Sequence, residues 1–141
     1  MLKTVIDTNL FVSSIINKSG IPAKLLQAWQ DHDFLSIISD QMLEEMRRVL
    51  QYPHIKNKYN LKDDDIAKVI DTIERFAVVL HDVGGVDVIS EDPDDNKVLA
   101  CAIAAEADFI VSGDKHLLKL GKFEDIPIMT AKDFLKKMEY E

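Results

Sequence analysis

The amino-acid sequence predicts an α/β fold, in which helices cover both faces of a mostly parallel sheet. Short apolar runs rich in β-branched residues alternate with helical patterns of ten or more residues, which is typical of parallel strands joined by crossover helices. The length of 141 residues suits a single domain over residues 1–141, with a core that needs no disulfide. The content of 47% hydrophobic and 30% charged residues is that of a globular chain.

The first half of the chain predicts two strands and three helices. Each strand is a short apolar run, and each helix has apolar residues spaced three or four apart. Asp7 ends the first strand, and Gly20 follows the first helix. Ser39 or Asp40 caps the third helix, because either side chain is favourable at an N-cap. In chain order we expect a strand at 3–6, helices at 8–17 and 21–31, a strand at 34–38 and a helix at 42–50.

The second half begins with a lysine-bearing connector, residues 54–59, and a long helix that three aspartates open. Gly84 and Gly85 separate this helix from the next element. Pro127 favours an edge position for the last strand, since proline donates no ladder hydrogen bond. We expect a helix at 62–80, a strand at 86–89, a helix at 92–107, a strand at 109–111, a helix at 115–120, a strand at 126–129 and a helix at 131–138.

Composition limits the classes of function. The net charge of −8 argues against a surface that coats nucleic acid by bulk charge alone. No apolar run approaches the ~20 residues that span a bilayer, and Asp7 interrupts any secretory signal. The single cysteine, Cys101, cannot form an internal disulfide, and its apolar surroundings predict a buried, inert thiol. We therefore expect a cytoplasmic protein.

Acidic residues follow the predicted strand ends. Asp7 directly follows the first strand, Asp114 follows the strand at 109–111, and residues 92–95 open the helix between them. In an open parallel sheet, function gathers beyond the carboxyl ends of the strands. Carboxylates brought together there repel one another unless a cation lies between them. Because oxygen ligands favour Mg²⁺ or Mn²⁺, the sequence predicts a divalent-cation site.

Each of these acids also has a structural interpretation. Asp7 and Asp114 are suited to N-caps. Asp92 and Asp94 fit the first turn of a helix, where the macrodipole favours negative charge. Asp95 lies at the third helical position, from which its carboxylate can turn inward.

Helical geometry separates the two adjacent glutamates of the helix at 42–50. Glu45 lies roughly 40° from Val49, on the shoulder of the apolar stripe. Glu44 points to the opposite side and is expected to pair with Arg48 at i, i+4. Glu45 is therefore the candidate for the site, and its alternative is a half-exposed surface residue.

Other chemistries lack support. One cysteine and four scattered histidines make a structural zinc site implausible. The chain has no dinucleotide fingerprint, no phosphate-binding glycine loop and no nucleophile elbow. A basic track for a polyanion could come from Arg47 and Arg48, from Lys56 and Lys58, or from Lys115, Lys119 and Lys122.

Four short blocks of the sequence resemble the PIN domain family, in particular the PIN proteins described as toxin components of toxin-antitoxin systems. The blocks occur in family order and span nearly the whole chain. They are residues 5–9 (VIDTN), 43–50 (LEEMRRVL), 92–96 (DPDDN) and 107–118 (ADFIVSGDKHLL).

This resemblance implies a Rossmann-like, three-layer α/β/α sandwich. It also implies an endoribonuclease that uses Mg²⁺ or Mn²⁺ to hydrolyse single-stranded RNA, with a cognate antitoxin as protein partner and a homodimer or higher oligomer as assembly. Carried over by position, the family's acidic catalytic and metal-binding quartet corresponds to Asp7, Glu45, Asp95 and Asp114. Its supporting polar positions correspond to Asn9, Asp92 and Ser112. The helix at 62–80 departs from the family pattern and either forms a dimer face or shields the site.

Three other interpretations stand beside this one. A receiver module carries an adjacent acid pair at the first strand, and a phosphoaspartyl hydrolase of the haloacid dehalogenase type carries Asp-x-Asp. This chain has Asp7-Thr8-Asn9, which fits neither. A PIN fold that binds RNA or protein as a scaffold, without cleavage, remains open.

Overall fold

The computed structural model describes residues 1–86 and 93–139 and contains a six-stranded sheet in the order β3-β2-β1-β4-β6-β5. All pairings are parallel except that of β5 with β6. The strands are β1 (Lys3–Ile6), β2 (Leu35–Ser39), β3 (Val78–Leu80), β4 (Phe109–Val111), β5 (Lys122–Phe123) and β6 (Ile126–Met129). The predicted α/β fold with a mostly parallel sheet is confirmed.

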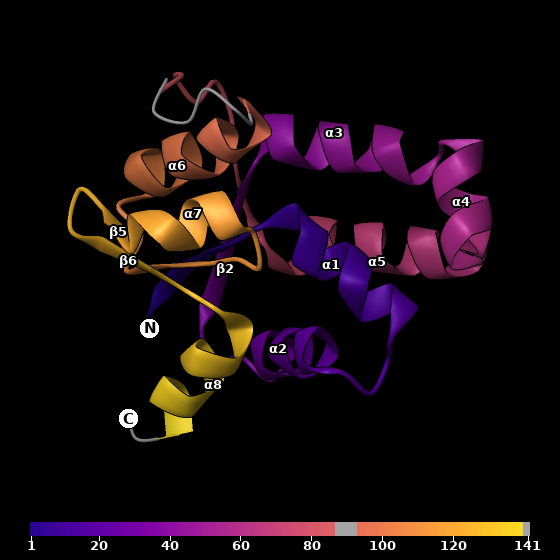
Figure 1. Ribbon diagram of the computed structural model, residues 1–141, viewed down its shortest axis with the longest axis horizontal. Helices are drawn as coiled ribbons and strands as arrows, with labels where there is room; N and C mark the ends of the chain where they lie inside the picture. The colour runs from indigo at the N-terminus through magenta and orange to yellow at the C-terminus, as the bar shows by residue number, and fades with distance from the viewer. Residues whose placement is uncertain (87–92, 140–141) are drawn as a thin grey trace.

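Helices flank this sheet, with α6 on one side and α2 and α8 on the other (Figure 1). Three further helices, α3, α4 and α5, project from the sheet as a helical arm: α3 runs outward, α4 turns the chain and α5 returns it (Figure 1). No helix in the described part of the chain is both long and apolar enough to cross a membrane. The bounds are α1 (Thr8–Ile16), α2 (Ile21–Gln30), α3 (Asp40–Leu50), α4 (Pro53–Tyr59), α5 (Asp63–Phe76), α6 (Pro93–Ala105), α7 (Lys115–Leu120) and α8 (Ala131–Glu139).

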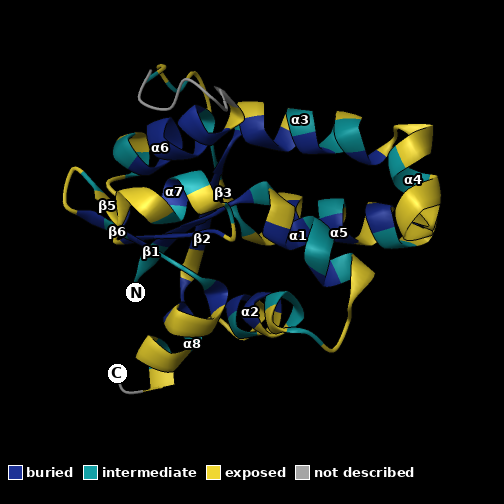
Figure 2. Ribbon diagram, viewed as in Figure 1, coloured by how far each residue is buried: buried dark blue, intermediate teal, exposed yellow. Residues whose placement is uncertain are grey.

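The core lies where the helices meet the sheet, and the central strands are buried almost throughout (Figure 2). Aromatic rings fix the packing on the side of α2 and α8. Phe34 and Phe134 meet edge to face at 5.0 Å between ring centroids, and Phe11 meets Trp29 at 6.0 Å. Such pairs contribute beyond the area that they bury. The sheet is therefore a rigid base for groups at its edge.

The strand order reverses at β1. Strand β2 pairs with one edge of β1, and β4 pairs with its other edge. The backbone N–H of Asp7 donates to the carbonyl oxygen of Val111 at 2.9 Å, so the carboxyl ends of β1 and β4 lie side by side. This reversal is the position at which open α/β sheets bind ligands.

The prediction of one helix over residues 62–80 is wrong at its end. Helix α5 stops at Phe76, and the next residues form the edge strand β3, which pairs with β2 through Val78, Val79 and Leu80. Extended backbone at Ala77 ends the helix. The apolar spacing through residue 80 fits a helix equally well, but pairing with β2 overrides it.

Three other predictions need correction. The predicted connector at 54–59 is helix α4, because Pro53 at the first helical position starts a helix rather than preventing one. The predicted edge strand at 126–129 is the second strand from the edge, since the unpredicted two-residue strand β5 covers it. Helix α6 ends at Ala105 rather than at residue 107. The predicted strand at 86–89 lies, except for Val86, outside the described residues.

The thiol of Cys101 is fully buried on α6, as predicted. Burial raises its pKa to about 12, although a backbone hydrogen bond at Ser39 acts in the opposite direction. Because only the thiolate reacts, we expect a disulfide reagent to leave the folded protein unmodified at mildly alkaline pH and to modify it fully in guanidinium chloride. Rapid stoichiometric labelling of the folded protein would contradict this burial.

Candidate functional site

Asp7 lies at the carboxyl end of β1 and is 4% exposed. It is the N-cap of α1, where its Oδ1 accepts the backbone N–H of Asn9 at 3.4 Å. Its Oδ2 accepts the hydroxyl of Ser112 at 2.8 Å. The capping interpretation is therefore correct, and the same carboxylate also lines a cavity described below.

Ser112 and Asp114 follow the neighbouring strand, β4. The Ser112 hydroxyl accepts the backbone N–H of Asp114 at 2.9 Å while donating to Asp7, so it fixes both strand ends relative to each other. The carboxylate of Asp114 caps α7, and its Oδ1 accepts the N–H groups of His116 at 2.8 Å and Leu117 at 3.2 Å.

The side chain of Asp95, in the first turn of α6, reaches Asp114. Burial alone would raise the pKa of Asp114, but a hydrogen bond with Asp95 and those from the Leu117 and His116 N–H groups together lower it. Two carboxyl groups share a hydrogen bond only while one of them holds a proton. When both are ionised the two groups repel one another, and a cation bound between their oxygens would remove that repulsion.

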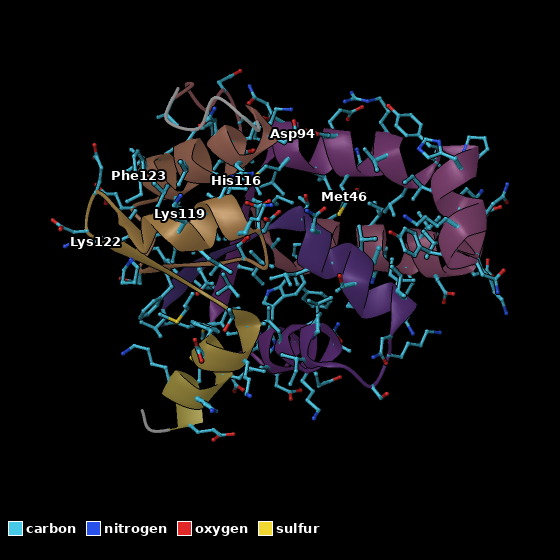
Figure 3. The ribbon with its side chains drawn as sticks, in the orientation of Figure 1. Met46, Asp94, His116, Lys119, Lys122 and Phe123 are labelled. Atoms are coloured by element: carbon cyan, nitrogen blue, oxygen red, sulfur yellow. The ribbon has the colours of Figure 1, made fainter. Side chains whose placement is uncertain are left out.

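A cavity of about 220 Å³ lies beside these groups, between α1, α3 and α6. Its lining contains three of the four predicted acids, Asp7, Glu45 and Asp95, each from a different helix start or face. Met46 lies on the wall that α3 contributes, with its side chain directed toward α1 (Figure 3). Asp114 does not line the cavity and joins the group through Asp95.

Glu45 is held by a lysine. The ammonium of Lys97 bonds the carboxylate of Glu45 and lies 3.3 Å from that of Asp94. The hydrogen bond to Glu45 raises the pKa of Lys97, so the lysine is a fixed positive charge within the cavity lining. By contrast, the adjacent Glu44 is exposed, as predicted.

The predicted pairing of Glu44 with Arg48 is wrong. Glu44 lies 3.8 Å from Arg47, three residues along α3, whereas Arg48 donates to the hydroxyl of Tyr52 at 3.3 Å. An exposed glutamate on a helix can pair with an arginine either three or four residues along. The two ion pairs differ little in energy.

The donor set suits a hard divalent cation, because it consists of carboxylate oxygens with a hydroxyl behind them. In the described residues, however, no three acidic, histidine or cysteine side chains are already arranged around a common centre. The bond between Glu45 and Lys97 accounts for part of this, since it directs Glu45 to an ammonium. The residues fit the cation chemically once that ammonium is displaced.

The structure thus brings together most of the residues that the sequence singled out. Asp7 and Ser112 are hydrogen-bonded, and Asp95 contacts Asp114. Asn9 lies exposed at the cavity and contributes its backbone N–H to Asp7. Asp92 lies outside the described residues.

Sequence reasoning missed Lys97. A signal for it exists: a lysine in the first turns of a helix opposes the macrodipole, which favours anions there. Such a charge is compensated by a nearby acid, and here the acid comes from α3.

Comparison with known proteins gives two findings. A family model described as PIN domain matches residues 3–116. The uncharacterized protein MJ1680 of Methanocaldococcus jannaschii is 30% identical over 146 residues, which cover 98% of this chain and 92% of that protein.

Proposed function

The chain belongs to the PIN domain family, and on that basis together with its acidic cavity we propose that it is a divalent-metal-dependent endoribonuclease acting on single-stranded RNA. PIN domains are usually metal-dependent nucleases. The observation that carries the proposal is the cavity at the reversal point of the sheet, which Asp7, Glu45 and Asp95 line together. Helix capping accounts for Asp7, but it does not require Glu45 and Asp95 to line the same cavity, where like charges repel one another.

In this proposal Asp7, Glu45, Asp95 and Asp114 hold Mg²⁺ or Mn²⁺. The cation supplies Lewis-acid activation of water and of the scissile phosphate. The chain's own contribution is orientation. Ser112 holds the Asp7 carboxylate, and the first turn of α7 holds that of Asp114, so both acids are fixed before substrate arrives.

The test is hydrolysis of a panel of single-stranded RNAs by the purified protein with Mn²⁺ and with a chelator. We expect cleavage with Mn²⁺ that leaves a 5′ phosphate, since activated water displaces the 3′ oxygen in this proposal, and no cleavage with the chelator. Duplex RNA is the control substrate. Absence of cleavage across the panel would refute the nuclease proposal.

The resemblance of the four sequence blocks to toxin components supports a further role as the toxin of a toxin-antitoxin pair. Induced expression in a bacterial host should then arrest growth, and the adjacent gene should relieve the arrest. The Asp7→Asn variant is the control, because growth arrest by cleavage needs the intact acids. Equal arrest by both forms would contradict this role.

A scaffold function has one observation in its favour. The Lys97–Glu45 bond leaves the described residues without a ready metal site. A scaffold of this kind binds RNA or protein with Mn²⁺ present and cleaves nothing. The RNA panel separates the two functions.

The Lys97→Met variant should bind Mn²⁺ more tightly than the wild type. The metal must displace the ammonium from Glu45, and a partly exposed ion pair is worth roughly 0.2–1 kcal/mol, so we expect a gain in affinity of about 1.4- to fivefold. Titration calorimetry without RNA measures it. Lys119→Met is the control, because this exposed lysine lies toward β5, away from Asp94 (Figure 3). Unchanged or weaker binding would show that Lys97 does not compete with the metal.

A further inference from the structure

The structure distinguishes among the basic residues that could meet an RNA strand. On the helical arm, Arg47 bonds Glu74 and Lys56 bonds Asp63, so both cations are already paired. On the opposite end of the molecule, Lys119 and Lys122 lie with Phe123 near β5, away from Met46 at the cavity (Figure 3). Arg48 differs from the two paired cations of the arm: it is exposed, and no carboxylate of the described residues lies within ion-pair distance.

Arg48 lies between Glu44 and Glu45 around α3, roughly 60° from Glu45. Arg48 and Glu45 are three residues apart, which places them one helical turn from each other. The hydrogen bond with Tyr52 and, more weakly, the charges of Glu45 and Glu44 raise the pKa of the Arg48 guanidinium. The Arg48 guanidinium is thus close enough to Glu45 for the two charges to interact.

An aromatic pair, Tyr52 and His54, follows Arg48 along the chain. The Nε–H of Arg48 donates to the hydroxyl of Tyr52 at 3.3 Å, and the rings of Tyr52 and His54 stack at 5.6 Å with an angle of 21° between their planes. Both rings are exposed, Tyr52 at 38%. The two exposed rings offer aromatic faces on which a base can stack.

The cavity lining approaches this pair along α3. It extends from Glu45 to Val49, and Tyr52 lies three residues farther. Glu45 and Tyr52 are separated by about 10 Å at the helical rise of ~1.5 Å per residue. One strand of stacked nucleotides advances ~3.4 Å per residue, so roughly three nucleotides cover the distance.

We propose that Arg48, Tyr52 and His54 form a subsite for the single-stranded RNA that leaves the cavity along α3. Arg48 binds a phosphate, and the stacked rings support one base about three nucleotides from the scissile phosphate. A phosphate-binding cation followed by an aromatic face is the general arrangement for holding single strands without reading their sequence. This subsite rests on the proposed function, because it is defined by the strand in the cavity.

The first test replaces one ring. Tyr52→Ala should raise the KM for a single-stranded RNA roughly tenfold at unchanged kcat, because a stacking contact is lost equally from bound substrate and transition state. Tyr52→Phe keeps the ring and should retain the wild-type KM. The matched control is Tyr59→Ala, at the other end of α4, which removes a tyrosine of the same 38% exposure.

A second test locates the base. An RNA with a single abasic position, moved along the strand, should raise the wild-type KM roughly tenfold at one position near the third nucleotide. At that position Tyr52→Ala should show no additional loss, because the base and the ring form one contact. Additive losses at every position would overturn the stacking assignment.

A third test concerns the cation. Arg48→Gln should lower the slope of log affinity against log salt concentration by about one, as expected for one phosphate contact. Arg47→Gln is the control, since Arg47 is paired with Glu74. Fluorescence anisotropy in a chelator gives the affinities without cleavage.

The outcomes separate this inference from the proposed function. If the wild type cleaves or binds RNA while Tyr52→Ala behaves like Tyr59→Ala, the subsite is wrong and the nuclease proposal stands. If the wild type neither binds nor cleaves RNA, both proposals are wrong. If only duplex RNA is bound, the subsite is also wrong, because a paired base has no free face for the rings.

Discussion

Asp7→Asn should lower manganese-dependent cleavage of single-stranded RNA at least about a hundredfold. Asp7 is the most central of the acids, buried at the end of β1 and hydrogen-bonded to Ser112. Asparagine offers one neutral oxygen in place of a carboxylate, so it holds a divalent cation poorly. Metal activation is worth several kcal/mol, and each ~1.4 kcal/mol is tenfold in rate. Single-turnover cleavage of an end-labelled RNA measures the loss.

The same variant should fold normally. Asparagine is as good an N-cap as aspartate, so α1 keeps its first hydrogen bond. Without metal, removal of one negative charge from the cavity that Asp95 also lines relieves repulsion, and the melting temperature should not fall. A large loss of activity with unchanged melting identifies a functional acid. A large fall in melting temperature would assign Asp7 to the fold instead.

Glu45→Gln should reduce cleavage by a similar factor, whereas Glu44→Gln should change it less than about twofold. The two residues are adjacent on α3, yet Glu45 lines the cavity and Glu44 is exposed beside Arg47. The comparison therefore holds helix, charge change and position in the chain nearly constant. Initial rates at saturating Mn²⁺ and over a manganese titration give the effects on catalysis and on metal binding.

Equal losses in the two glutamine variants would contradict the assignment of Glu45. Such a result would indicate that the total negative charge of α3 attracts the metal at long range. Salt screens long-range attraction between exposed charges. Raising the ionic strength would then remove the effect of both variants together.

The sequence predicted the central strands because their signals were local and strong. Lys3–Ile6 and Phe109–Val111 are short β-branched or apolar runs that helical patterns bound on both sides. Val78–Leu80 could not be separated from the preceding helix, because its apolar residues continue the spacing of α5. Its strand character comes from pairing with β2, which is far away in the sequence.

In the candidate site, too, features with local signals could be predicted and contacts made by the tertiary fold could not. The angle of Glu45 on its helix follows from helical geometry alone, and the cavity lining agrees with it. The contact between Asp95 and Asp114 agrees with the prediction that the start of the helix containing Asp95 lies beside the strand end before Asp114. The position of Lys97 indicates that it needs an acidic partner, but that this partner is Glu45 could not be predicted, because the two are 52 residues apart and only the tertiary fold brings their helices together.

Helix α4 has consequences for how substrate binding can be followed. None of its residues, Pro53–Tyr59, is buried, although it forms the tip of the helical arm. Segments with so few packed side chains open locally at little free-energy cost, and their amide hydrogens exchange with deuterium early. An RNA strand resting on Tyr52 and His54 should slow that exchange. Mass spectrometry would therefore detect RNA bound to the helical arm as slower deuterium uptake in α4. Deuterium uptake by the central strands, whose amides are already protected, should not change.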